Sequence, residues 1–229
     1  ERIRRVNEFL VGLREYSQLD ERANELFEGQ ARFFRAFLYF QLAKRHGGVI
    51  LYTDMDLQKD KSRASAEATW DLIEEDLDFA ASALPVQWSG SDQGRVTKGA
   101  AFALKSRAML YAERWESAKV AADSVLTLGI YDLTENYEDA WKGGNEESIL
   151  EYNYLLTGPN HTFDKDYATY GEIENQGGSG TPTQEMVEAY EKADGTEVDW
   201  EPWHQDGGTT TRPPYEELEP RFHATVIYN

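Results

Sequence analysis

The sequence predicts a mostly α protein in which paired helices form a scaffold, joined by long loops and a few short strands. Through most of residues 1–150, apolar residues recur at three- and four-residue steps, the spacing of an amphipathic helix. After residue 150, glycine, proline and aromatic residues follow one another without that period, which is typical of long structured loops. We therefore expect one domain over residues 1–229, with a helical-repeat portion at 1–150 and a loop-rich portion at 151–229.

The first predicted helix covers residues 2–17, where apolar side chains form one stripe: Ile3, Val6, Phe9, Leu10 and Leu13. The second runs from a capping residue, Asp20, to His46, and Gly47 ends it. Its last turn is basic, which suits the negative end of the helix dipole. Both helices are thus predicted from their apolar stripes and from the residues at their ends.

The second helix carries four phenylalanines and one tyrosine between residues 33 and 40. At helical spacing these rings fall on almost every side, which is typical of a helix buried among others. Arg32 and Arg35 lie one turn apart beside this apolar surface, so we expect them in salt bridges with carboxylates from other elements. The rings therefore predict a core and not a ligand surface.

Three further helices are predicted at 68–84, 97–113 and 115–129, the last two joined as an antiparallel hairpin with alanine on the facing sides. Two helix pairs can be drawn, 29–46 with 68–84 and 97–113 with 115–129, which resemble degenerate tetratricopeptide-like hairpins. Trp70, Trp115 and Trp141 are expected to pack in this body. Residues 49–53 are predicted as a short strand or an extended link, residues 148–156 as a strand, and a helix capped by Thr183 follows the long loop.

Composition and motifs exclude several function classes. The formal net charge of -19 disfavours nucleic acid as a partner, because a phosphate backbone would be repelled. The chain has no cysteine, its four histidines lack metal-ligand spacing, and no nucleophile-elbow, P-loop or dinucleotide motif occurs. Acidic pairs such as Glu146 and Glu147 are expected by chance among 42 acidic residues. The stretch 194–199 faintly resembles a calcium loop but fails the EF-hand spacing. We predict neither an enzyme nor a cofactor.

One stretch, "EGQARFFRAFLYFQLAKRHGGVILYTD" at 28–54, resembles the hallmark helix of the SusD/RagB family of outer-membrane nutrient-binding lipoproteins. The matching positions are Ala31, Arg32, Phe33, Arg35, Ala36, Tyr39, Phe40, Leu42, Gly48, Val49 and Leu51. Gln30 replaces the usual acid, and Ile50 stands where proline is common. Later phrases resemble the family in the same order, among them "TWDLIEEDLDFAASALP", "NEESILEYNY" and "EPRFHATVIYN".

The resemblance implies a tetratricopeptide-like scaffold whose long loops build a binding face for a glycan, without catalysis. It also implies a partner, a SusC-like TonB-dependent transporter, and a place in the outer membrane facing the cell exterior. Known members carry an N-terminal lipid-anchoring cysteine and are longer at both ends. The chain has neither a first Met nor a signal peptide and stops in a strand-like phrase, so we expect a piece of a longer protein.

The candidate ligand-binding residues lie after residue 150. Trp200 and Trp203 flank Pro202 in a loop, and an indole offers a flat apolar face to the C–H side of a sugar ring. Either tryptophan could instead pin the loop to the body of the protein. The second group of candidates borders the long loop: Asn153, Tyr154, His161 and Tyr170.

A different class of function stays open from the sequence. A helical-repeat scaffold that binds protein or peptide partners would present a groove lined by the repeat helices. A glycan-binding protein would present exposed aromatic side chains on loops after residue 150. The two readings therefore differ in which part of the chain forms the binding surface.

Overall fold

The structure is a computed structural model that describes residues 1–55, 60–154, 157–168, 178 and 180–228. Its internal contacts divide the chain into two compact units. Unit 1 comprises residues 1–134 and 143–151, and unit 2 comprises residues 135–142 and 152–229. Each unit has a hydrophobic core of its own. The expected single domain over residues 1–229 stays a prediction.

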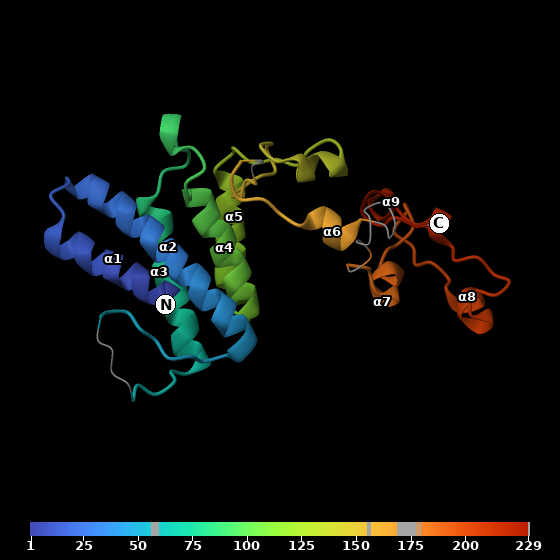
Figure 1. Ribbon diagram of the computed structural model, residues 1–229, viewed down its shortest axis with the longest axis horizontal. Coiled ribbons are helices and arrows are strands. Elements are labelled where there is room, and N and C mark those ends of the chain that lie inside the picture. The colour runs from blue at the N-terminus through green and yellow to red at the C-terminus, as the bar shows by residue number, and fades with distance from the viewer. Residues whose placement is uncertain (56–59, 155–156, 169–177, 179, 229) are drawn as a thin grey trace. The chain divides into compact units, whose positions relative to one another are not determined.

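Unit 1 is a stack of five helices (Figure 1). They are α1 (Arg2–Tyr16), α2 (Glu21–His46), α3 (Ala66–Ala83), α4 (Lys98–Tyr111) and α5 (Trp115–Thr127), with a short 3₁₀ turn, η1, at Gly90–Asp92. Helix α2 packs against α1 and α3, α3 packs against α4, and α4 packs against α5. The five predicted helices are confirmed, with ends that differ by at most a few residues.

The caps of α2 explain why it begins and ends where it does. The Asp20 carboxylate accepts a hydrogen bond from the backbone N–H of Ala23 at 2.8 Å, which satisfies one unpaired donor of the first turn. At the other end Gly47 has φ +67°, a left-handed conformation that glycine adopts without steric cost. Both caps were predicted from the sequence.

The aromatic rings of α2 divide between two environments. Phe33, Tyr39 and Phe40 are buried in the core of unit 1, with Tyr39 completely inaccessible. Phe34 and Phe37 are 49% and 41% exposed. The expectation that all five rings are core is therefore wrong for these two. Phe34 lines a hollow together with Val6 and Phe9 of α1, so its ring is only partly covered.

Two tryptophans also depart from the expected core positions. Trp70 lies partly buried against the core and its ring contacts Phe40. Trp115 is 62% exposed and Trp141 is 77% exposed, so the expectation of core packing is wrong for both. Trp115 is the first residue of α5. Trp141 lies in a short 3₁₀ segment, where its ring contacts that of Tyr137.

A buried ion pair joins α2 to α3. The Arg35 guanidinium donates from Nε to Asp76 Oδ2 and from Nη2 to Asp76 Oδ1, both at 2.7 Å, and both residues are buried, Asp76 completely. Arg35 Nη1 also donates to Asn7 Oδ1 of α1 at 3.2 Å. Arg32 pairs with Glu28 of the same helix at 2.8 Å and with Asp76 of α3 at 3.6 Å. The salt bridges predicted for both arginines are thus confirmed.

None of the described residues forms a strand, so residues 49–53 are the extended link that the sequence allowed, and the strand predicted at 148–156 is wrong over its described residues, 148–154. Residues 49–53 are extended, but side chains satisfy their backbone in place of a second strand. The backbone N–H of Tyr52 donates to the Tyr39 hydroxyl at 2.7 Å, and its carbonyl accepts from Asn7 Nδ2 at 2.7 Å. Residues 148–154 also lack a strand partner. The one β-bridge in the described chain joins Lys192 and Leu218.

Unit 2 consists of short helices connected by irregular segments. They are η2 (Tyr137–Lys142), α6 (Phe163–Tyr167), α7 (Gln184–Glu188), α8 (Glu201–Asp206), η3 (Tyr215–Glu217) and α9 (Pro220–Thr225). Five residues form the buried core of unit 2: Val187, Val198, Trp200, Leu218 and Phe222. The predicted cap at Thr183 is confirmed, although α7 ends already at Glu188. Among the described residues, no helix combines the length and apolarity that a membrane crossing requires.

Candidate functional site

Unit 2 carries a continuous series of exposed aromatic rings, which we call the aromatic row. Its members in chain order are Tyr152, Tyr154, His161, Phe163 and Tyr167. Successive ring centroids are 5.1, 5.1, 6.2 and 4.8 Å apart. The tyrosines and the phenylalanine expose between 53% and 69% of their surfaces, and His161 is exposed as well. The row is therefore a surface of rings that contact one another and also face solvent.

Local hydrogen bonds hold the middle of the aromatic row. The backbone N–H of Phe163 donates to His161 Nδ1 at 3.2 Å, and α6 starts at this point. The Thr162 hydroxyl donates to Asp166 Oδ2 at 3.1 Å across the first turn. These short-range contacts orient three neighbouring rings without burying them.

Glycine allows a second chain segment to pass close to the last ring of the row. A Cβ built on Gly180 would lie 2.2 Å from Cε1 of Tyr167, a distance that no side chain tolerates. The N–H of Gly180 donates to the Asp166 carbonyl at 2.8 Å, and the N–H of Gly178 donates to the Ala168 carbonyl at 2.8 Å. The segment supports Tyr167 from beside the ring, which stays 54% exposed.

The row offers both kinds of contact that a sugar ring accepts. The faces of the rings are apolar and suit the C–H side of a pyranose. The phenol hydroxyls of the tyrosines donate and accept hydrogen bonds. Because Nδ1 of His161 accepts from Phe163, the proton of the neutral imidazole lies on Nε2, which can donate to a ligand. Asn153 is exposed between Tyr152 and Tyr154 and adds an amide.

The structure brings together some of the candidate residues named from the sequence. Tyr154 and His161 are direct ring neighbours at 5.1 Å, and Asn153 precedes Tyr154 in the same exposed segment. Tyr170 lies outside the described residues. The sequence reasoning did not name Tyr152, Phe163 or Tyr167 as site residues. The aromatic residues after residue 150 mark this stretch in the sequence, but only the structure shows that these three rings are exposed.

The two tryptophans of "VDWEPWHQ" lie in different environments. Trp200 is 7% exposed and belongs to the core of unit 2, where its ring lies 6.2 Å from that of Tyr215. Trp203 is half-buried, 6.0 Å from Trp200 in an edge-to-face arrangement. Gly208, with φ +73°, lets the backbone approach Trp203, since a Cβ there would lie 2.8 Å from Nε1. Trp203 thus has the more accessible indole of the two.

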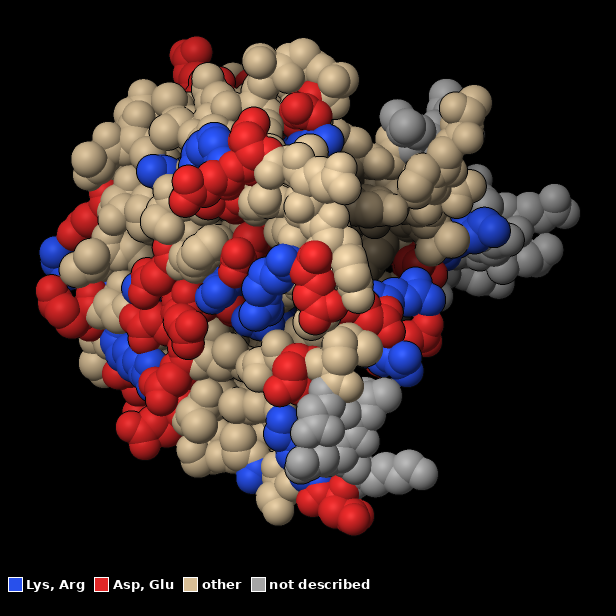
Figure 2. Space-filling model, turned by 90° about the vertical axis from the view of Figure 1, so that its left-hand side faces the viewer, with Lys and Arg blue, Asp and Glu red and all other residues tan. Residues whose placement is uncertain are grey.

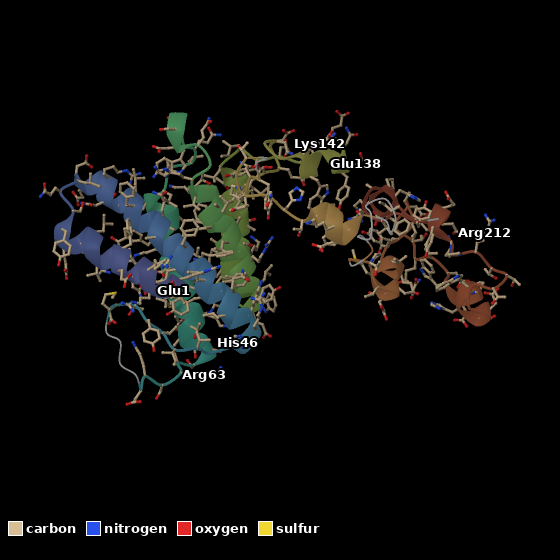
Figure 3. The ribbon with its side chains drawn as sticks, in the orientation of Figure 1. Glu1, His46, Arg63, Glu138, Lys142 and Arg212 are labelled. Carbon is tan, nitrogen blue, oxygen red and sulfur yellow. The ribbon has the colours of Figure 1, made fainter. Side chains whose placement is uncertain are left out.

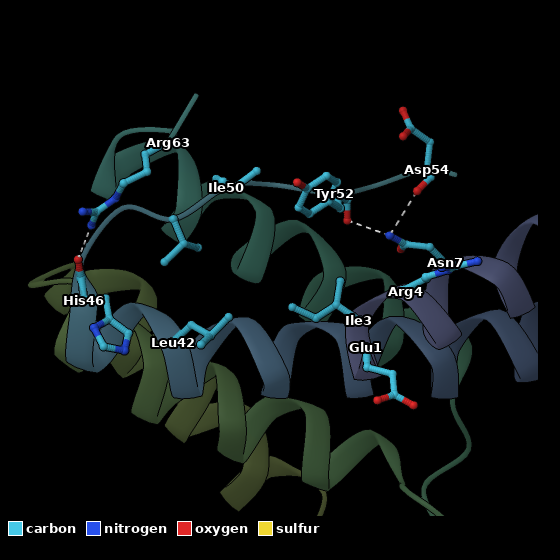
Figure 4. A pocket seen from close by; sticks show the side chains of 11 residues that line it. Glu1, Ile3, Arg4, Asn7, Leu42, His46, Ile50, Tyr52, Asp54 and Arg63 are labelled. Carbon is cyan, nitrogen blue, oxygen red and sulfur yellow. Dashed lines mark hydrogen bonds between the residues drawn. The ribbon is translucent and has the colours of Figure 1, made fainter. Parts of the chain in front are cut away.

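Unit 1 contains a hollow of about 670 Å³ between α1, the end of α2 and residues 49–54 (Figure 4). Its walls are largely apolar and include Ile3, Leu42, Val49, Ile50 and Tyr52. Asn7 fastens the extended segment over α1, because its amide donates to the carbonyls of Tyr52 at 2.7 Å and Asp54 at 3.4 Å. The predicted repeat helices contribute only the end of α2 to this hollow, and the rest of its lining comes from α1 and the irregular segment after α2.

A metal centre has no support in the described part of the chain, where no three His, Cys, Asp or Glu residues form a group able to hold an ion. In the calcium-like stretch, Asp194 Oδ1 accepts from the backbone N–H and the hydroxyl of Thr196 at 3.0 and 2.6 Å. These bonds close a tight turn and lower the pKa of Asp194. The carboxylate therefore serves the turn.

Comparison with known proteins gives the class and the family. Residues 1–110 match a family model described as starch-binding and associating with the outer membrane, and residues 146–229 match the model of the SusD family. Both models describe SusD-type proteins, a class that is associated with the outer membrane and includes carbohydrate-binding members. The chain belongs to the SusD/RagB family and is SusD-like.

Solved structures agree with this assignment over almost the whole chain. A SusD-like protein from Bacteroides fragilis is 32% identical, with a TM-score of 0.82 over 97% of this chain and 46% of its own. A SusD-like carbohydrate-binding protein from the same species is 25% identical, with a TM-score of 0.81 over 99% of this chain and 44% of its own. A laminarin-binding SusD-like protein is 27% identical, with a TM-score of 0.57 over 64% of this chain and 34% of its own.

The chain spans less than half of the length of these structures. It covers 22% and 26% of the curated SusD-like relatives that it matches. The family and the fold are therefore established on one part of a SusD-like protein.

Proposed function

We propose that this protein binds a glycan, an oligo- or polysaccharide, without catalysis, and that the aromatic row is the surface that contacts it. The observation that carries the proposal is the exposure of at least 53% at each tyrosine and phenylalanine of a continuous series of rings. Exposed rings cost free energy in water, and a series of them is typical of a surface that a ligand covers. Known carbohydrate-binding relatives support the ligand class.

Within this proposal the residues have distinct roles. Tyr154 and His161 contact sugar rings by their faces and edges, and Asn153 donates and accepts hydrogen bonds with hydroxyls. Trp203 contributes a further, half-buried face, while Trp200 positions it from the core of unit 2. Tyr170 stays a candidate from the sequence.

The experiment compares binding of neutral polysaccharides, amylose and laminarin among them, by isothermal titration calorimetry and affinity electrophoresis. The test variant is Tyr154→Ala/Phe163→Ala, which removes two rings from the centre of the row. The matched control is Tyr16→Ala, because Tyr16 is 76% exposed in unit 1 and lies outside the row. We expect the test variant to lose about tenfold or more in affinity and the control to bind like wild type. Equal binding by the test variant would refute the assigned surface.

We further propose that the protein is held at the outer membrane by a lipid anchor and faces the cell exterior. There it delivers its glycan to a SusC-like TonB-dependent transporter. The association of the matching family with the outer membrane supports this location. Co-purification of the transporter with the full-length protein from outer-membrane fractions is the expected result. Recovery of the protein from soluble fractions alone would contradict it.

The hollow in unit 1 supports a second candidate function, the binding of a protein or peptide partner by the helical scaffold. A large side chain placed at Ile50, on the wall of the hollow, would block such a partner and leave the aromatic row unchanged. Under the glycan hypothesis, Ile50→Trp binds polysaccharide like wild type. Loss of transporter co-purification in this variant, with glycan binding intact, would assign the hollow to the partner.

A further inference from the structure

The charges and spacing around the aromatic row point to a narrower ligand class. We infer that the row binds an uncharged glycan chain several sugar units long, and that it discriminates against anionic polysaccharides such as sulfated or uronate-rich chains. This inference rests on the glycan-binding function proposed above, and it adds the charge and the length of the ligand.

The unit that carries the row is strongly acidic. Unit 2 has 18 Asp and Glu residues and five Lys and Arg residues, a net charge of -13. Unit 1 has 24 acidic and 18 basic residues, a net charge of -6. A polyanion that approaches unit 2 meets a strongly negative field, which slows its association and weakens its binding.

Most of the basic residues of unit 2 already form ion pairs. Lys142 pairs with Asp139, Lys192 pairs with Glu217, and Arg221 pairs with Glu219. Arg212 lies at the end of unit 2 remote from α6, the helix that carries the last two rings of the row (Figure 3). The segment 152–167 contains no arginine. Bidentate recognition of carboxylate or sulfate by arginine is therefore absent from this segment.

The remaining basic residue is Lys165 in α6, and the two residues beside it in the chain are aspartates. Asp166 is exposed, and its carboxylate accepts one hydrogen bond from Thr162. The charged residues of the row segment thus sum to -1, with the single cation beside two anions. Ring faces and hydroxyls dominate the contacts that the row offers, and these suit a ligand without formal charge.

The spacing of the rings bears on the length of the glycan that the row binds. The rings of the row are separated by four steps of 4.8 to 6.2 Å, and the first three pairs stand nearly edge to face, at 70° to 89°. Neighbouring rings therefore present different faces and do not merge into one platform. A monosaccharide reaches one or two of them, whereas a chain of several sugars reaches all. Because the contacts lie within one ligand, affinity rises with chain length until the row is covered.

The experiment uses the full chain and a panel of neutral polysaccharides, amylose, laminarin, xyloglucan and galactomannan, each beside its carboxymethyl derivative. For any polysaccharide that binds, we expect the derivative to bind about tenfold more weakly at 20 mM salt. The difference should shrink at 500 mM salt, where charges more than a few ångströms apart are screened. Oligosaccharides of the same linkage should bind more tightly as they lengthen from one to seven units.

Variants separate this inference from the function on which it rests. Asp166→Asn removes one negative charge beside the row. It should reduce the difference in affinity between a neutral polysaccharide and its carboxymethyl derivative. Glu197→Gln removes an equal charge from the exposed loop before α8 and should leave this difference in affinity unchanged. If a carboxymethyl derivative binds more tightly than its parent and the Tyr154→Ala/Phe163→Ala variant loses it, this inference fails while the glycan function stands. If no polysaccharide binds, the proposed function fails and this inference with it.

Discussion

The aromatic rings of the two units lie in opposite environments. In unit 1, Phe33, Tyr39 and Phe40 of α2 are at most 3% exposed, since α1, α3 and α4 pack around that side of the helix. In unit 2, the tyrosines and phenylalanine of the aromatic row are at least 53% exposed and contact mainly one another. Aromatic density alone therefore does not identify a ligand surface. What decides is whether another helix covers the ring.

Charges divide between the units in a parallel way. On the face of unit 1 that Figure 2 shows, Lys and Arg side chains lie among Asp and Glu side chains. Ion pairs of unit 1 also join helices: Arg114 at the start of α5 binds Glu74 and Asp71 of α3. In unit 2 the acids outnumber the bases more than threefold. Unit 1 thus uses charge to join its helices, whereas much of the charge of unit 2 faces solvent.

The largest expected effect tests the interior of unit 1. Arg35→Met leaves the Asp76 carboxylate buried without its bidentate partner, and a buried unpaired charge costs about 3 to 5 kcal/mol. We expect a loss of that size in the free energy of unfolding of the stack, measured by urea denaturation followed by circular dichroism.

Two controls accompany Arg35→Met. Arg35→Met/Asp76→Leu removes both charges and should recover most of the lost stability, since an apolar pair replaces an ion pair at little cost. Arg4→Met breaks an exposed pair with Glu8 and should change stability by less than about 1 kcal/mol. A similar loss for Arg4→Met and Arg35→Met would contradict the assignment of the pair to the core.

A smaller effect is expected at the glycine that follows α2. A Cβ on Gly48 would lie 2.1 Å from the Ala64 carbonyl oxygen and 2.7 Å from the Ser65 carbonyl carbon, both backbone atoms. Gly48→Ala must therefore displace the segment that caps α3, where the Ser65 hydroxyl accepts from the N–H of Ala68. We expect a loss of about 1 to 3 kcal/mol in thermal or urea unfolding.

The matched substitution for Gly48→Ala is Gly12→Ala in α1. A Cβ on Gly12 meets no atom within 4 Å, and alanine is the better helix former. Gly12→Ala should stabilise unit 1 by up to about 1 kcal/mol. Opposite signs for the two glycines are the result that the geometry requires.

Much of the fold of unit 1 could be predicted because its signals are local. Asp20 and Gly47 bound α2, and the apolar stripes locate all five helices. The sequence left residues 49–53 open between a strand and an extended link, because the decisive contacts come from distant side chains. Asn7 and Tyr39 hold that segment through hydrogen bonds to Tyr52, and no pattern of strand residues reveals such partners.

The candidate site was predicted in part for a similar reason. Tyr154 and His161 were named because they border the long loop, and their rings are neighbours. Phe163 and Tyr167 were not named, since a loop sequence does not show which side chains stay exposed. Trp200 was named for its irregular surroundings, yet it lies in the core of unit 2, because Tyr215 from a later segment packs on it. Contacts between separate loops leave no periodic pattern in the sequence, so they could not be predicted from it.

The pH dependence of unit 1 tests how charge joins its helices. Burial acts to raise the pKa of Glu74, but hydrogen bonds from Ser117, Arg114 and Lys105 outweigh it, so the pKa lies below its ordinary value. A carboxyl group whose pKa is lower in the folded state stabilises that state above its unfolded pKa, about 4.3. This contribution is lost as the pH falls through the lower folded pKa.

Glu74→Gln should therefore lower the free energy of unfolding by about 1 kcal/mol at pH 7, because a charged acceptor is replaced by a neutral one. Below the folded pKa the wild type and the variant should be nearly equal, since Glu74 is then protonated in both the folded and the unfolded states. Urea unfolding at a series of pH values measures the difference. A constant difference over the whole pH range would show that packing, and not charge, sets the effect.

The smallest expected change in stability concerns the aromatic row and completes the comparison of the two units. Phe163 is 59% exposed, so Phe163→Ala should change the free energy of unfolding by no more than about 0.5 kcal/mol. Phe40→Ala, which empties a ring-sized volume in the core of unit 1, should cost about 3 to 5 kcal/mol. Thermal unfolding and glycan binding measured on the same samples separate the two roles. Phe163→Ala should weaken binding with stability retained. A large loss of stability in Phe163→Ala would mean that this ring stabilises unit 2. The row would then have a structural role, like the buried rings of α2.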